Sequence, residues 1–174
     1  MADIDQQPRQ DLSGDDARSK IHELGKDVRT CMFGSQTEEA GVDFRPMAIQ
    51  AVEEDGSVWF LSSSNSDKNA HLARDDRVVL TFQDDGASKY MYLSGRADIH
   101  ADKATIDKYW TAFANNWFDG QDDPRVTVIR FRPMAGHYWE TDSGKIVAMA
   151  KMMIGAVTGG AIKNDGGVDG ELSV

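Results

Sequence analysis

A long run of alternating side chains, from Lys89 to Ala101, constrains the fold of this chain more than any other feature. One side of the run carries Met91, Leu93, Ala97 and Ile99, and the other carries Tyr90, Tyr92, Arg96 and His100. Strict alternation is the period of a strand with one buried face. The run therefore predicts a long, half-buried strand, with Gly95 as a bulge or bend.

Shorter strand patterns surround this run at even spacing. They predict strands over residues 29–35, 42–52, 57–62, 77–82, 125–133 and 137–141, and helices over residues 13–28, 66–74 and 102–115. The strands follow one another mostly as hairpins, for example through Asp55-Gly56. Such an order favours an antiparallel barrel over a doubly wound sheet. We expect a mainly β fold with inserted helices.

The composition changes at both ends of the chain. Residues 1–12 are polar and are expected to form a flexible N-terminus. Residues 13–144 are expected to form one domain, which suits a chain of 174 residues. Residues 145–174 begin with a Met-rich segment and continue with two glycine pairs, so a flexible tail is expected there.

Charge and cysteine content restrict the partners and the compartment. A net charge of −10 argues against nucleic acid, which requires a basic surface. No apolar run approaches the length of a membrane span, and the N-terminus lacks the apolar core of a signal peptide. The single cysteine, Cys31, fits a reducing cytosol and sits in an apolar run, which predicts a buried, inert thiol. We expect a cytoplasmic protein with no membrane partner. The histidines show no metal-ligand spacing, so no metal is assigned.

A serine-rich turn, Ser62 to Lys68, is the candidate ligand site. It places four hydroxyls, an amide and an ammonium group at the start of a predicted helix. A helix start offers unpaired N–H groups and a positive dipole end, which together suit a phosphate. Alternatively, Ser66 or Asp67 only caps the helix. Arg45, on a preceding strand, is a second candidate cation for the phosphate or a surface charge.

Proline and tryptophan residues give two further expectations. Pro46 lies inside a predicted strand, which implies a sheet edge or an irregularity because proline has no N–H. Trp110 and Phe113 lie on the stripe of the predicted helix and are expected in the core. Trp117, Phe118 and Trp139 lie at element ends, where contact with a ligand or a subunit interface is as well supported as a place in the core.

An ordered set of segments resembles the flavin-binding split barrels related to pyridoxamine 5'-phosphate oxidase, and among them the bacterial general stress proteins. The segments are Arg45-Pro46-Met47, Trp59-Phe60-Leu61-Ser62-Ser63, Ser66-Asp67-Lys68 and Arg77-Val78-Val79-Leu80-Thr81-Phe82, followed by Trp110, Trp117-Phe118 and Tyr138-Trp139. The resemblance covers roughly residues 15 to 145.

This resemblance implies a six-stranded antiparallel split β-barrel of the FMN-binding type. It also implies a homodimer with FMN at sites between the subunits; FAD and a deazaflavin are less favoured. The cofactor-binding residues it implies are Arg45, Pro46, Met47, Ala48, Leu61, Ser62, Ser63, Ser66, Asp67, Lys68, Trp117 and Trp139. Arg45 and Lys68 would reach the phosphate, and Trp117 and Trp139 would come from the partner subunit.

The function suggested by the resemblance is a stress-related flavoprotein with FMN-dependent oxidoreductase activity on an unknown substrate. The chain has no counterpart of the C-terminal segment through which the oxidases engage their substrate, so oxidation of vitamin B6 is not expected. A non-enzymatic flavin-binding or flavin-buffering protein and a flavin-free dimeric interaction module remain alternatives. No side chain stands out as an acid or base, so no catalytic residue is named.

Overall fold

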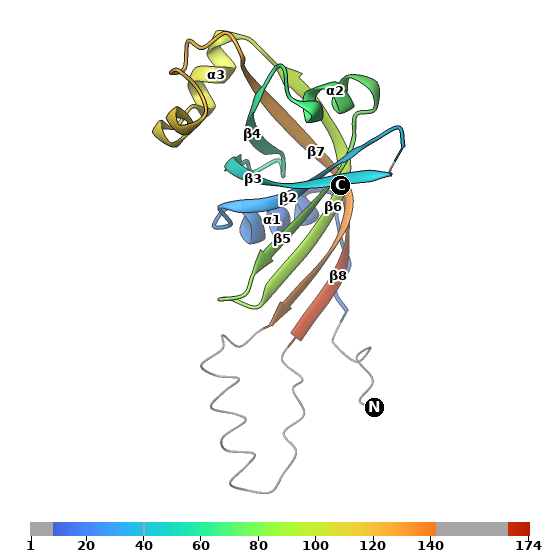
Figure 1. Cartoon of the computed structure of the whole chain (residues 1–174). Coiled ribbons are helices and arrows are strands. Elements are labelled where there is room, and N and C mark those ends of the chain that lie inside the picture. Colours follow the sequence, from blue (N-terminus) through green and yellow to red (C-terminus); the bar gives the residue numbers. More distant parts are fainter. Residues whose placement is uncertain (1–8, 40, 142–166) are drawn as a thin grey trace, which may run out of the picture.

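The computed structural model describes residues 9–39, 41–141 and 167–174. Its elements in chain order are β1 (Leu12–Ser13), α1 (Gly14–Gly25), β2 (Thr30–Gln36), β3 (Val42–Val52), β4 (Val58–Ser63), α2 (Asp67–Arg74), β5 (Arg77–Asp84), β6 (Lys89–His100), α3 (Lys103–Tyr109), the short 3-10 helix η1 (Ala112–Asn116), β7 (Val126–Thr141) and β8 (Gly167–Ser173). Figure 1 shows α2 and α3 near the same end of the sheet.

Six antiparallel strands close into a barrel in the order β7-β4-β3-β2-β5-β6, because β6 also pairs with β7. The interior is filled by fully buried side chains that include Phe33, Phe60 and Phe131. Helix α1 contributes its predicted apolar face to the same core. The predicted mainly β, six-stranded antiparallel barrel with inserted helices is confirmed. Within the described residues, no helix combines the length and apolarity needed to cross a bilayer.

A β-bulge joins what the sequence predicts as two separate strands. Ser94 pairs with Ala135 and Gly95 with Pro133, so Met134 is an extra residue on β7. Pro133 is tolerated at this irregularity. A Cβ at Gly95 would collide with the carbonyl oxygen of Arg132, which explains the glycine. The predicted bulge at Gly95 is confirmed, and β7 is one continuous strand.

The helix predicted over residues 102–115 is shorter than expected. It ends at Tyr109, and Trp110 and Thr111 have extended backbone angles before η1 begins. The helical stripe consequently does not continue, and Phe113, expected in the core, is 58% exposed. Helical period alone does not detect the contacts of Tyr109 and Thr111 that end this helix.

The tail prediction is wrong for Gly167–Ser173, which form β8; residues 142–166 lie outside the described part of the chain. Strand β8 pairs with the second half of β7, which β4 leaves uncovered, and β1 adds in parallel. Of the predicted flexible N-terminus, Arg9 and Leu12 instead pair with β8. Figure 1 shows β8 beside the far half of β7.

Leu172 provides a test of this C-terminal strand, because its side chain is only 1% exposed and packs into the main core. Leu172→Ala should lower the free energy of unfolding by roughly 2–4 kcal/mol through lost burial and a cavity. The neighbouring, exposed Ser173→Ala is the control. Urea unfolding measures both. A loss below about 0.5 kcal/mol for Leu172→Ala, the range of surface substitutions, would contradict a docked β8.

Candidate functional site

The barrel opens where β3 and β4 diverge. These strands pair only between Ile49–Val52 and Val58–Phe60. Earlier residues of β3 continue to pair with β2, while Leu61–Ser63 of β4 pair with β7. Residues 42–48 of β3 therefore have a strand partner on one side only among the described strands. Pro46 lies on this stretch, which confirms its predicted edge position.

A cavity of about 270 Å³ lies at this divergence. Its lining residues are Pro46, Met47, Ala48, Gln50, Leu61, Ser62, Ser63, Lys68, Phe113, Ala114, Trp117 and Phe118. All of these except Gln50, Phe113, Ala114 and Phe118 are among the predicted cofactor-binding residues, and Phe118 is predicted, together with Trp117, to face a ligand or a subunit interface. Alternation along β3 could have indicated Gln50, two residues after Ala48. The cavity thus brings together both strands, the serine-rich turn and the segment after α3.

A buried polar network shapes the serine-rich turn. The Ser62 hydroxyl donates to Asn69 Oδ1 (2.6 Å), and Asn69 Nδ2 donates to Thr127 Oγ1 (3.0 Å). Thr127 in turn donates to the carbonyl oxygen of Ser62 (3.1 Å). Ser66 caps α2, as predicted, by accepting from the Asn69 N–H. Sequence reasoning did not single out Asn69, since nothing local signals that its amide reaches β7.

The hydroxyls of the turn differ in what they can offer a ligand. Ser62 and Ser63 line the cavity, but their protons are donated to Asn69 and Asn65. Ser66 and Asp67 lie outside this cavity and line a separate hollow together with Thr127. Ser66 and Asp67 therefore do not share this cavity with Ser62, Ser63 and Lys68, and their contact with the ligand stays a prediction.

Lys68 is the charged group of the cavity. Its side chain is half-buried and forms no hydrogen bond or ion pair with any described residue. Burial lowers the pKa of Lys68, and the positive charge of Arg45 lowers it further, while Asp67 opposes both. Arg45 itself pairs with Asp43 and does not line the cavity. The positive charges of Arg45 and Lys68 are therefore close enough to repel each other. An anion bound beside Lys68 would offset both this repulsion and the cost of burying the ammonium group.

An aromatic wall follows α3. Phe113 and Trp117 are 58% and 60% exposed, and their rings meet edge to face with centroids 4.9 Å apart. Trp117 thus lines a cavity of its own chain, whereas the family resemblance implies that it reaches the flavin from the partner subunit. Trp139 does not line the cavity. It lies near the other end of β7, beside His137 and Tyr92.

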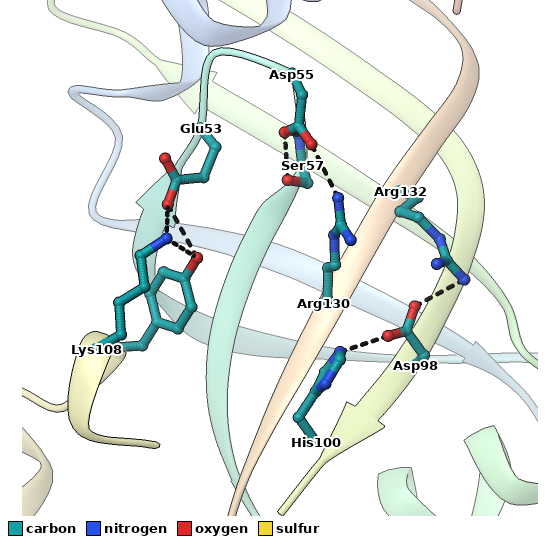
Figure 2. A network of polar contacts seen from close by, with 9 residues as sticks. Glu53, Asp55, Ser57, Asp98, His100, Lys108, Arg130 and Arg132 are labelled. Carbon is teal, nitrogen blue, oxygen red and sulfur yellow. Dashed lines mark hydrogen bonds and ion pairs between the residues drawn. The ribbon is translucent and has the colours of Figure 1, made fainter. Parts of the chain in front are cut away.

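A polar network outside the cavity holds this wall in place. Tyr109 stacks on Trp59 with ring centroids 4.2 Å apart, and its hydroxyl donates to Glu53 (2.9 Å). Figure 2 shows Lys108 reaching the same carboxylate, beside an ion pair between Asp55 and Arg130. Both contacts tie α3 and β7 to the hairpin of β3 and β4.

Two further contacts fix the segment beyond α3. The Thr111 hydroxyl donates to Gln50 Oε1 (3.1 Å), which joins the segment to β3. After the wall, Asp123 accepts from the Asp119 N–H and from the Arg125 side chain, and this lowers the pKa of Asp123. The position of the wall thus depends on residues outside the cavity.

The cavity offers little acid–base chemistry. Among the residues that the structure describes, Lys68 is the only one with an ionisable side chain that lines the cavity. No group of three His, Cys, Asp or Glu side chains in the described residues could hold a metal ion. Cys31 is buried as predicted, and burial raises the pKa of its thiol to about 12, so the thiolate is not formed at neutral pH. The arrangement can bind an anion and a flat ring.

Comparison with known proteins identifies the family. Residues 16–163 match the family described as pyridoxamine 5'-phosphate oxidase like, so the chain belongs to that family. Protein bli-3 of Neurospora crassa is 27% identical over 125 residues, which cover 66% of this chain. The chain spans 60% of the length of that relative.

Solved structures share the fold. A candidate general stress protein 26 from Jannaschia sp. CCS1 has a TM-score of 0.72 at 24% identity, over 91% of this chain and 98% of that one. The general stress FMN/FAD binding protein of Xanthomonas citri has a TM-score of 0.64 at 26% identity, over 75% of this chain and 93% of that one. The barrel is therefore a split barrel of this family.

Asn69→Ala tests the network that shapes the turn. The substitution removes the acceptor of the buried Ser62 hydroxyl and the amide donor to Thr127 Oγ1, so the free energy of unfolding in urea should fall by about 1–3 kcal/mol. Asn65→Ala removes the same amide from an exposed position and should change little. Equal effects of the two substitutions would show that the buried network does not stabilise the turn.

Proposed function

We propose that this chain binds FMN in the cavity between β3 and β4. Lys68, assisted by Arg45, would hold the phosphate at the start of α2. The observation that carries this proposal is the half-buried Lys68 ammonium group with no ionic partner among the described residues. The similar protein of Xanthomonas citri is described as a general stress FMN/FAD binding protein, which supports a flavin over other phosphate compounds.

The open edge of β3 suits the flavin ring. Ile49 directs its N–H to the carbonyl of Arg29 on the β2 side. Because strand residues alternate, the polar backbone groups of Ala48 point away from β2, toward the open side. Met47, Leu61 and Trp117 provide apolar surface that would exclude water from the ring. When bound, the flavin would supply hydride and single-electron transfer, while the chain supplies binding and orientation.

A homodimer is part of the proposal. The outer faces of β3, β2, β6 and β7 expose Val42, Phe44, Met32, Tyr90, Tyr92 and Trp139. Register places Met32 opposite both Pro46 and Thr81, and Thr81 opposite Tyr92, so these residues share one face of the sheet. An apolar face of this extent is typical of a subunit interface. Pro46 connects it to the cavity, which supports a flavin site near the subunit boundary.

The reaction proposed is that of a stress-related, cytoplasmic oxidoreductase that uses FMN. In the described part of the chain, Lys68 alone brings an ionisable side chain to the cavity, and this favours a second candidate, a flavin-binding protein without turnover. Oxidation of NADH or NADPH with FMN and common acceptors separates the two. Turnover that Lys68→Ala abolishes supports the enzyme, whereas flavin binding without turnover supports the second candidate.

Lys68→Ala should raise the dissociation constant of FMN by about 10- to 100-fold, the size of one lost charged hydrogen bond. Quenching of FMN fluorescence on titration with protein measures it. Wild-type protein that is colourless as purified and binds no added FMN would refute the proposed site.

Lys68→Arg is the matched control, because it keeps the charge. Burial and Arg45 lower the pKa of Lys68, so the free wild-type protein loses this charge at a lower pH than an ordinary lysine would. FMN affinity should therefore be full while Lys68 is protonated and should fall as pH rises through that lowered pKa. The fall should be absent in Lys68→Arg.

Phe44→Asp tests the proposed dimer. A carboxylate at this exposed apolar position would have to be buried on association, so light scattering should show monomers where the wild type gives dimers. Ile99→Asp adds the same charge on the opposite side of β6 and should leave dimers. Dimers of unchanged stability in Phe44→Asp would rule out this face as the interface.

A further inference from the structure

Arg45 has a carboxylate partner within its own strand. Its Nη2 donates to Oδ2 of Asp43, two residues earlier on β3, and the two side chains form an ion pair. The side chain of Arg45 is 21% exposed, whereas that of Asp43 is 49% exposed. The guanidinium is therefore largely withdrawn from solvent, and its partner is a carboxylate that is half in water.

Strand geometry keeps this pair together and places it near the cavity. Residues two apart on a strand project from the same face, so Asp43, Arg45 and Met47 share one face of β3. The pairing of β3 with β2 has a continuous register over all three residues. Met47 is buried and lines the cavity. The ion pair thus continues the strand face that Met47 presents to the cavity.

Helix α2 lies against the same face and carries Lys68. A hydrogen bond joins Nδ1 of His71, on α2, to the hydroxyl of Ser35 on β2 (2.9 Å). Ser35 is opposite Asp43 in the register, and opposite residues of an antiparallel pair face the same side. The charge of Arg45 also lowers the pKa of Lys68, so the two cations are near each other. Asp43 therefore belongs to the surroundings of the proposed phosphate position.

The balance of charges makes Asp43 unfavourable for a phosphate. Lys68 and Arg45 are accompanied by two carboxylates, Asp67 and Asp43, so these four groups together carry no net formal charge. A phosphate monoester carries nearly two negative charges at neutral pH. It would have to share the guanidinium of Arg45 with Asp43 or replace Asp43 there. In either arrangement the carboxylate repels the phosphate.

We infer that Asp43 limits the affinity of the site for phosphate-bearing flavins, because it competes with the phosphate for the guanidinium of Arg45. This inference rests on the proposed flavin site and adds a residue that determines its specificity. Asp43 acts through another residue and is therefore a positioning residue. It should affect FMN but not riboflavin, the flavin that has no phosphate.

Asp43→Asn tests the inference, since it removes the charge and keeps the size of the side chain. It should lower the dissociation constant of FMN roughly tenfold, the lower end for a charged hydrogen bond. The dissociation constant of riboflavin should not change. Asp43→Glu keeps the carboxylate and should bind FMN about as the wild type does. Quenching of flavin fluorescence on titration with protein measures both flavins.

A double-mutant cycle shows whether Asp43 acts through Arg45. The gain in FMN affinity from Asp43→Asn should be at least about threefold smaller in an Arg45→Met background. Asp67→Asn is the matched control, because Asp67 acts on the charge of Lys68 and forms no ion pair with Arg45 in the described part of the chain. Its effect on FMN affinity should be the same with and without Arg45.

FMN binding by the wild type separates this inference from the proposed function. Absence of that binding overturns both. If the wild type binds FMN, three results overturn this inference alone: no gain in FMN affinity for Asp43→Asn, an equal gain for riboflavin, or a gain that is undiminished without Arg45. A gain in affinity requires a folded variant, so loss of folding cannot imitate the expected result.

Discussion

The divergence of β3 and β4 is the constraint on which the candidate site depends. Backbone N–H and C=O groups in a sheet need partners, and a strand that loses its neighbour exposes a row of them. Here β3 keeps β2 on one side but loses β4 before Ile49. Pro46 reduces the number of exposed donors on that stretch. The cavity lies where the sheet would otherwise have continued, so the fold itself provides an edge that a ligand can satisfy.

The remaining parts of the cavity are positioned by contacts outside it. Strand β4 turns into α2 through Ser62, Asn69 and Thr127, which bring the ammonium group of Lys68 to the opening. On the other side, α3 ends at Tyr109, which stacks on Trp59, and residues of the segment that follows line the cavity. The cavity thus has a positive charge at one end and aromatic rings at the other. These two features complement the phosphate and the flat ring of a flavin nucleotide.

The sequence predicts the parts of this arrangement that depend on local patterns. Alternation along residues 89–101 indicates the long strand, Ser66 indicates the helix cap, and the turn before Lys68 indicates an anion site. The failures share a different cause. Tyr109 and Thr111 end a helix through contacts with β4 and β3, and β8 pairs with a strand that precedes it by more than twenty residues. Gly170 is a glycine because the Gln10 carbonyl lies where a Cβ would be, not because the tail is flexible.

The most direct test of the central claim is a crystal structure of the protein with FMN. We expect the phosphate within hydrogen-bond distance of Lys68 Nζ, and the ring along Pro46, Met47 and Ala48 at the open edge of β3. A flavin bound elsewhere, or one whose phosphate points away from Lys68, would contradict the account.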